Sequence, residues 1–85
     1  MNYYCYILQS YKTRKYYIGS TNNLEKRLKE HNQGCTTSTR YSCPWKLVYY
    51  ETFNSRIKAC IRERQIKSYK GGNAFKKIIN LGEVA

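Results

Sequence analysis

The segment Tyr16–His31, YYIGSTNNLEKRLKEH, holds side chains that could bind an anion and move a proton. It contains Arg27 and, four residues later, His31, which is the chain's only histidine. At 100° per residue, both side chains fall on the same helical stripe as Leu24 and Leu28. An arginine on the inward side of a short amphipathic helix needs a partner, which can be a carboxylate, a carbonyl or a ligand phosphate. The spacing fits either two packed side chains whose hydrogen bonds are satisfied within the protein or two residues on one side of a reaction site.

Two tyrosines and one glutamate complete the set of candidate reactive side chains. Tyr6 and Tyr17 are predicted to share one face of a hairpin, and Glu63 lies on the arc of a predicted helix that is turned away from its solvated side. Phosphodiester hydrolysis depends mainly on charge neutralisation and on orienting a water molecule. Arginine can clamp the phosphate oxygens, and one carboxylate can hold one Mg²⁺ or Mn²⁺ whose other ligands are water and phosphate. The chain has no aspartate, which argues against a carboxylate-rich two-metal site.

The charge balance indicates a polyanionic partner. Sixteen lysines and arginines against five acids give a formal charge of +11 over 85 residues. Such a field attracts nucleic acid first and a membrane surface second. No apolar run reaches the roughly 18 residues of a spanning helix, and no signal-peptide pattern begins the sequence. We expect one domain over residues 1–85, located in the cytoplasm and without a membrane segment.

The cysteine pattern predicts free thiols. The four cysteines are widely and irregularly spaced and lack the C-x-x-C pairs of a zinc site, at Cys5, Cys35, Cys43 and Cys60. Disulfides are also rare in the intracellular setting that we expect. The pattern therefore favours neither zinc nor disulfide bonds.

Three aromatic and β-branched runs predict strands at residues 3–8, 15–19 and 45–53. The first two form a hairpin if residues whose numbers sum to 23 are paired, which closes the turn near Tyr11 and Lys12 and sets Tyr6 opposite Tyr17. The other face of the hairpin is the more apolar one, so helices are expected to cover it; its members are Cys5, Ile7, Tyr16 and Ile18.

Helix signals follow the hairpin and the third strand. A first helix is capped by Thr21 or Asn22, runs to His31 and stops at Gly34; the polar stretch 35–44 then reads as a loop. A second helix, 55–70, places Ile57 and Ile61 on its apolar stripe and Lys58, Arg62 and Gln65 on its solvated side. A third helix, 73–80, is capped by Asn73 and followed by a frayed tail at 81–85. The order β-β-α-β-α-α predicts an α+β fold with a small three-stranded antiparallel sheet flanked by helices.

These residues resemble the signatures of the GIY-YIG nuclease superfamily, and most of all its small stand-alone bacterial branch. The first signature is matched by YCY at 4–6, where only Tyr6 is retained, and the second is intact as YIG at 17–19. The family arginine, the histidine found in several branches and the metal-binding glutamate match Arg27, His31 and Glu63. The resemblance covers roughly residues 3–79.

The resemblance implies hydrolysis of a DNA phosphodiester with one divalent ion, Mg²⁺ or Mn²⁺. In this interpretation Glu63 holds the metal and Arg27 stabilises charge on the phosphate. Tyr6 and Tyr17 position or deprotonate the attacking water, His31 assists a tyrosine, and the choice of base between the two tyrosines stays open. Gly19 would let the phosphate approach the strand closely.

The remaining basic residues predict a phosphate-tracking surface without a sequence code. Its DNA-contacting members, besides Gly19, are expected to be Lys15, Arg40, Arg64, Lys67 and Lys70. Tyr41 and Trp45 either stack on unpaired bases or pack, with packing favoured. DNA is thus the expected substrate, with branched or single-stranded forms recognised by shape, and a protein partner is a further candidate for targeting. The alternative function is a non-catalytic or partner-dependent nucleic-acid-binding module on a nuclease-like fold.

Overall fold

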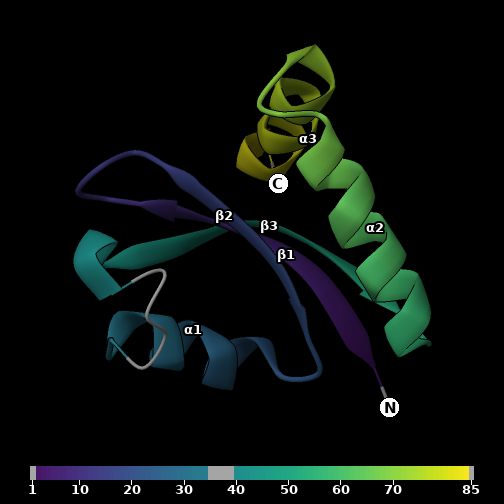
Figure 1. The fold of residues 1–85 in the computed structure, drawn as a ribbon, viewed down its shortest axis with the longest axis horizontal. Coiled ribbons are helices and arrows are strands. Elements are labelled where there is room, and N and C mark those ends of the chain that lie inside the picture. Colours follow the sequence, from purple (N-terminus) through teal and green to yellow (C-terminus); the bar gives the residue numbers. More distant parts are fainter. Residues whose placement is uncertain (1, 35–39, 85) are drawn as a thin grey trace.

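A three-stranded antiparallel sheet forms the middle layer of the molecule, with helices on both faces (Figure 1). The structure is a computed structural model that describes residues 2–34 and 40–84. Strands β1 (Tyr3–Ser10), β2 (Tyr16–Thr21) and β3 (Trp45–Phe53) lie in the spatial order β2-β1-β3. Helix α1 (Leu24–Asn32) packs on one face of the sheet. Helices α2 (Arg56–Ser68) and α3 (Asn73–Val84) pack on the other, which confirms the α+β class and the element order.

The hairpin register differs from the predicted one by two residues. Tyr6 pairs with Gly19 and Tyr17 with Leu8, so the prediction that Tyr6 lies opposite Tyr17 is wrong. The two strands meet at Ser10, whose N–H donates to the Lys15 carbonyl over 2.9 Å, and the intervening loop is therefore longer than the predicted turn. A shift of two residues preserves the alternation of faces, so Tyr6 and Tyr17 still lie on the same side of the sheet.

Each face of the sheet has its own hydrophobic cluster. On the side of α2 and α3, Cys5 and Ile7 pack with the helix residues Ile66, Phe75, Ile78 and Ile79. On the side of α1, Tyr6, Leu8 and Trp45 pack with Leu24 and Leu28. The apolar hairpin face is thus covered by helices as predicted, and the tyrosine face is covered as well.

The ends of two helices differ from the sequence-based expectation. Strand β2 continues through Thr21, so α1 is capped by Asn23 rather than by Thr21 or Asn22; the Asn23 side chain accepts a hydrogen bond from the Lys26 N–H over 3.1 Å. Helix α3 begins at Asn73 and runs to Val84, so the predicted frayed tail is helical up to that residue. No proline interrupts this segment, and Ile78 and Ile79 anchor it to the core. Of the predicted loop at 35–44, residues 35–39 lie outside the described residues, and Arg40–Ser42 form a 3₁₀ turn, η1.

Helix α2 buries a different side from the predicted one. Ile57 and Ile61 are 71% and 59% exposed, whereas Ala59 and Ile66 are buried. The small side chain of Ala59 lets the helix approach the sheet, and that approach turns the Ile57–Ile61 stripe outward. Arg62, expected on the solvated side, instead reaches β3 and pairs with Glu51 over 2.9 Å.

Candidate functional site

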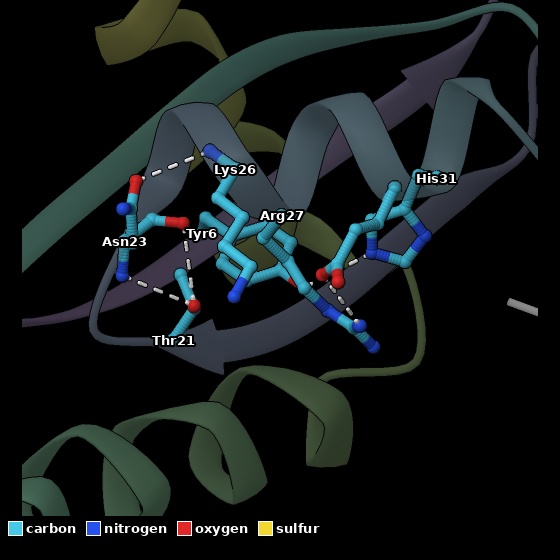
Figure 2. Close-up of polar contacts among 7 residues, drawn as sticks. Tyr6, Thr21, Asn23, Lys26, Arg27 and His31 are labelled. Carbon is cyan, nitrogen blue, oxygen red and sulfur yellow. Dashed lines mark hydrogen bonds and ion pairs between the residues drawn. The ribbon is translucent and has the colours of Figure 1, made fainter. Parts of the chain in front are cut away.

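Helix α1 carries His31 into the protein interior, where it meets Tyr6 of β1. Leu24 and Leu28 pack against the cluster that contains Tyr6, and this anchoring directs the same stripe of the helix towards the sheet. The Tyr6 hydroxyl lies 3.1 Å from His31 Nε2, and both residues are buried (Figure 2). Two residues far apart in the sequence thus form a polar pair inside an otherwise apolar cluster.

Burial sets the protonation states of this pair. It raises the pKa of Tyr6 to about 12, although hydrogen bonding to Arg27 and the charge of Arg27 act in the opposite direction. It lowers the pKa of His31 to about 4, and the nearby positive charge of Arg27 adds to that effect. At neutral pH, Tyr6 is therefore a phenol and His31 a neutral imidazole, and one member of the pair donates a single hydrogen bond to the other.

Gly19 makes room for the Tyr6 ring. A Cβ atom at Gly19 would lie 2.7 Å from the Tyr6 hydroxyl oxygen and 3.1 Å from Cε1 of Tyr17. Any side chain there would push both tyrosines out of place. The structure therefore supplies a packing reason for the glycine that the sequence signature does not reveal.

Tyr17 and Arg27 lie at the more open side of this pair. The Tyr17 ring centroid is 4.7 Å from that of His31 and 6.4 Å from that of Tyr6, and Tyr17 is half-buried. Hydrogen bonding to Tyr6, and more weakly to Glu30 and Tyr17, raises the pKa of Arg27 above its ordinary value against the effect of burial. The structure thus brings four of the five predicted catalytic residues together: Tyr6, Tyr17, Arg27 and His31.

Glu30 is a member of the site that sequence reasoning missed. Its carboxylate lies 3.3 Å from the Arg27 guanidinium. At 100° per residue, Glu30 falls outside the helical stripe that Leu24 and Leu28 share with Arg27 and His31, and this position hides the contact. Its separation of three residues from Arg27 is the signal that could have found it, because side chains at i and i+3 are neighbours on a helix.

Glu63 lies on α2, on the far side of the sheet from α1. Its carboxylate pairs with Lys67 over 2.7 Å, and its side chain is 22% exposed. Contact between Ser20 of β2 and Cys60 of α2, with the hydroxyl oxygen and the sulfur 3.6 Å apart, brings this helix to the edge strand β2. The negative charge of Glu63 raises the pKa of Tyr6 slightly. Glu63 is therefore within electrostatic range of the tyrosine pair, and its direct partner is Lys67.

The predicted DNA-contacting residues come from several segments of the fold. Lys15, Arg64, Lys67 and Lys70 are exposed, and the side chain of Arg40 lies outside the described part of the chain. Tyr16 and Gly71, the chain neighbours of Lys15 and Lys70, line one hollow. Arg64 and Lys67 lie on α2.

The stacking and cysteine predictions have separate outcomes. Trp45 is buried and packs against Tyr17 with ring centroids 6.3 Å apart, so packing, the favoured alternative, is confirmed for it, whereas Tyr41 is exposed. Cys5 and Cys60 are free thiols, the Cys43 thiol donates a hydrogen bond to the His31 carbonyl over 2.9 Å, and Cys35 falls outside the described residues. Within residues 2–34 and 40–84, no three His, Cys, Asp or Glu side chains gather as metal ligands. Nor is any helix in these two ranges long and apolar enough to cross a bilayer.

Comparison with known proteins places this geometry in a family. The family model described as the GIY-YIG catalytic domain matches residues 2–76. The chain is 51% identical over 65 residues to a UPF0213 protein of Clostridium perfringens, an alignment that covers 75% of this chain and 69% of the relative. It is 40% identical over 68 residues to a UPF0213 protein of Haloquadratum walsbyi, an alignment that covers 79% of this chain and 75% of the relative.

A solved structure extends the likeness to the fold. The solution NMR structure of a UPF0213 protein from Bacillus halodurans superposes with a TM-score of 0.60 at 30% identity, covering 95% of this chain and 85% of that one. The family model and the fold match each cover most of the chain. The chain belongs to the GIY-YIG catalytic-domain family and is similar within it to the UPF0213 proteins.

Proposed function

We propose that this protein is an endonuclease that hydrolyses DNA phosphodiester bonds with one divalent metal ion. The observation that carries the proposal is the convergence of Arg27 and His31 from α1 on Tyr6 and Tyr17 of the hairpin, in a member of the GIY-YIG family. A guanidinium beside hydroxyl groups suits a phosphate in the reaction, since it neutralises charge on the non-bridging oxygens.

Arg27 is the phosphate-binding group in this proposal. Its raised pKa keeps it cationic throughout the physiological range, and its side chain is only partly buried, so a ligand can reach it. A bound phosphate would compete with Glu30 for the guanidinium. Arginine offers a planar fork of donors that lysine lacks, and the orientation of the phosphate therefore depends on the side chain type as well as on its charge.

Tyr17 is better placed than Tyr6 to position the attacking water. Tyr6 is only 2% exposed, and burial raises its pKa to about 12, so at neutral pH its hydroxyl stays protonated and cannot accept a proton from the attacking water. Tyr17 is half-buried and lies against the His31 ring. We assign water positioning to Tyr17 and give the Tyr6–His31 pair the role of holding the Tyr17 ring in place.

Glu63 would hold the divalent ion. It is a single, partly exposed carboxylate, which fits a Mg²⁺ or Mn²⁺ ion that keeps several waters and also binds the substrate phosphate. Its ion pair with Lys67 would have to open for this. When bound, such an ion withdraws negative charge from the phosphate and lowers the pKa of a coordinated water.

Metal-dependent cleavage by matched variants tests this proposal. Purified protein is incubated with single-stranded, branched and plasmid DNA in Mg²⁺, Mn²⁺ or chelator. Glu63→Gln should abolish measurable cleavage, because it removes the only carboxylate assigned to the metal. Glu83→Gln, which removes a carboxylate from the end of α3, should leave cleavage unchanged. Equal cleavage by wild type and Glu63→Gln would contradict the assignment.

The alternative is a nucleic-acid-binding module without catalysis. Two ion pairs favour it, since Arg27 with Glu30 and Glu63 with Lys67 are already satisfied within the protein. Binding of DNA by the wild type with no cleavage in either metal would select this alternative.

A further inference from the structure

A second hollow lies on the α1 side of the sheet, beside the beginning of that helix. It encloses about 430 Å³, and its walls include Tyr4, Tyr50, Leu47 and Asn22. This volume falls in the range of clefts that bind small ligands, roughly 300–1,000 Å³. The proposed reaction leaves this hollow unused.

An aromatic pair contributes to the lining of this hollow. The rings of Tyr4 and Tyr50 meet edge to face with centroids 6.0 Å apart. Tyr50 is 52% exposed, and the neighbouring Leu47 is 36% exposed. A surface that presents a tyrosine ring and an aliphatic side chain side by side gains free energy when a flat apolar group covers it.

The hollow and the proposed reaction site lie on the same sheet face. Tyr50 pairs with Tyr6 across β1 and β3, and Tyr4 precedes Tyr6 by two residues on β1. Gly19 and Tyr17 lie on β2, on the other side of β1. Adjacent strands are separated by about 4.8 Å, so β3 and β2 are roughly 10 Å apart. A short stretch of extended nucleic acid strand can span that distance.

We propose that this hollow binds an unpaired nucleobase of the strand whose phosphate Arg27 holds. Tyr50 would stack on the base, and the exposed Asn22 side chain would offer an amide to its hydrogen-bonding edge. The formal charge of +11 supplies the attraction to the backbone that a polyanionic strand requires. A base inside a duplex cannot enter, because both its faces are covered by its neighbours in the stack. The inference rests on the proposed function in taking the bound strand to be the substrate.

Binding measured without cleavage tests this subsite. Fluorescence polarisation in chelator compares a short single-stranded deoxyoligonucleotide, the same sequence as a blunt duplex, and a single strand of abasic residues. Tyr50→Ala should weaken binding of the single strand roughly five-fold or more, since loss of one stacked base costs about that much. It should leave duplex and abasic strand within about two-fold of wild type, because their binding depends on charge.

Two further variants keep the test specific. Tyr50→Phe retains the ring and should bind the single strand as the wild type does. Tyr11→Ala removes a tyrosine of similar exposure from the hairpin loop and should also bind as the wild type does. Unchanged single-strand binding by Tyr50→Ala, or an equal loss on all three ligands, would overturn the inference. Binding is measured without metal, so a protein that never cleaves DNA can still lose single-strand affinity in Tyr50→Ala; the base-binding hollow would then stand while the proposed function fails. If the wild type cleaves DNA but Tyr50→Ala binds the single strand normally, only the base-binding hollow is refuted.

Discussion

The two faces of the sheet are built from different kinds of side chain. On the side of α2 and α3, the cluster is almost entirely aliphatic and aromatic, with Ile7, Ile66 and Phe75 at its centre. On the side of α1, the interior holds a hydrogen-bonded phenol and imidazole, Tyr6 and His31, with a guanidinium at the margin. Burial of polar groups costs free energy unless they are paired. The first face therefore stabilises the fold, and in the proposed function the second face holds the reactive groups in position.

The largest change is expected on the face of the sheet that α2 and α3 cover. Ile79→Ala truncates a buried side chain of α3 and should cost about 2–5 kcal/mol of unfolding free energy. At temperatures where the variant stays folded, DNA cleavage per folded molecule should match the wild type. Thermal denaturation measures the loss of unfolding free energy, and single-turnover kinetics measures the cleavage rate. Loss of cleavage in fully folded Ile79→Ala would show that the two faces are not separate in function.

A second prediction concerns the pH dependence of the α1 face. The pKa of His31 in the folded protein is lowered to about 4, below the ordinary value of 6.5. Between these two values the unfolded chain binds more protons than the folded one, so stability should fall as the pH is lowered from about 6.5 to about 4. The contribution is at most about 3–4 kcal/mol, from 1.36 kcal/mol for each pKa unit.

Nuclear magnetic resonance measures this pKa directly. The protein has one histidine, so its imidazole signals need no assignment. The titration midpoint in the folded state should lie well below 6.5. A midpoint between 6 and 7 would mean that His31 is solvated, and the α1 face would then contain no buried pair of Tyr6 and His31.

The smallest of these effects is expected at Gly19. Gly19→Ala places a methyl group 2.7 Å from the Tyr6 hydroxyl oxygen, and the resulting overpacking should cost about 1–3 kcal/mol. Because the clash displaces Tyr6 and Tyr17, cleavage should fall even where the protein remains folded. Ser20→Ala, one residue away on the opposite face, is the matched control. It should lower the unfolding free energy and the cleavage rate less than Gly19→Ala does. Equal behaviour of the two variants would argue that Gly19 has no special part in placing the tyrosines.

The elements of the fold could be predicted from the sequence because their signals are local. Periodicity and helix-stop residues identify three strands and three helices in the right order. The hairpin register was missed because it depends on the loop, in which Arg14 takes a left-handed φ of 65° and the Ser10 side chain accepts hydrogen bonds from Lys12 and Thr13. Such a loop conformation leaves little trace in residue type.

Tertiary contacts explain what else could not be predicted. On α2, an isoleucine stripe is the stronger sequence signal, yet close packing through Ala59 leaves Ile57 and Ile61 exposed. At the site, the family signatures identify Tyr6 and His31 as separate residues. Their hydrogen bond and the fit of the Tyr6 ring over Gly19 depend on the packing of α1 against the sheet.

The proposed function depends on Arg27 binding the reacting phosphate, and Arg27→Lys is its sharpest test. The substitution retains the positive charge but removes the planar fork of donors. Single-turnover cleavage in Mn²⁺ should fall roughly 10²- to 10³-fold, as expected for loss of a group that stabilises the transition state. Affinity for DNA and the melting temperature should change little. Cleavage by Arg27→Lys within about three-fold of the wild type would contradict the account.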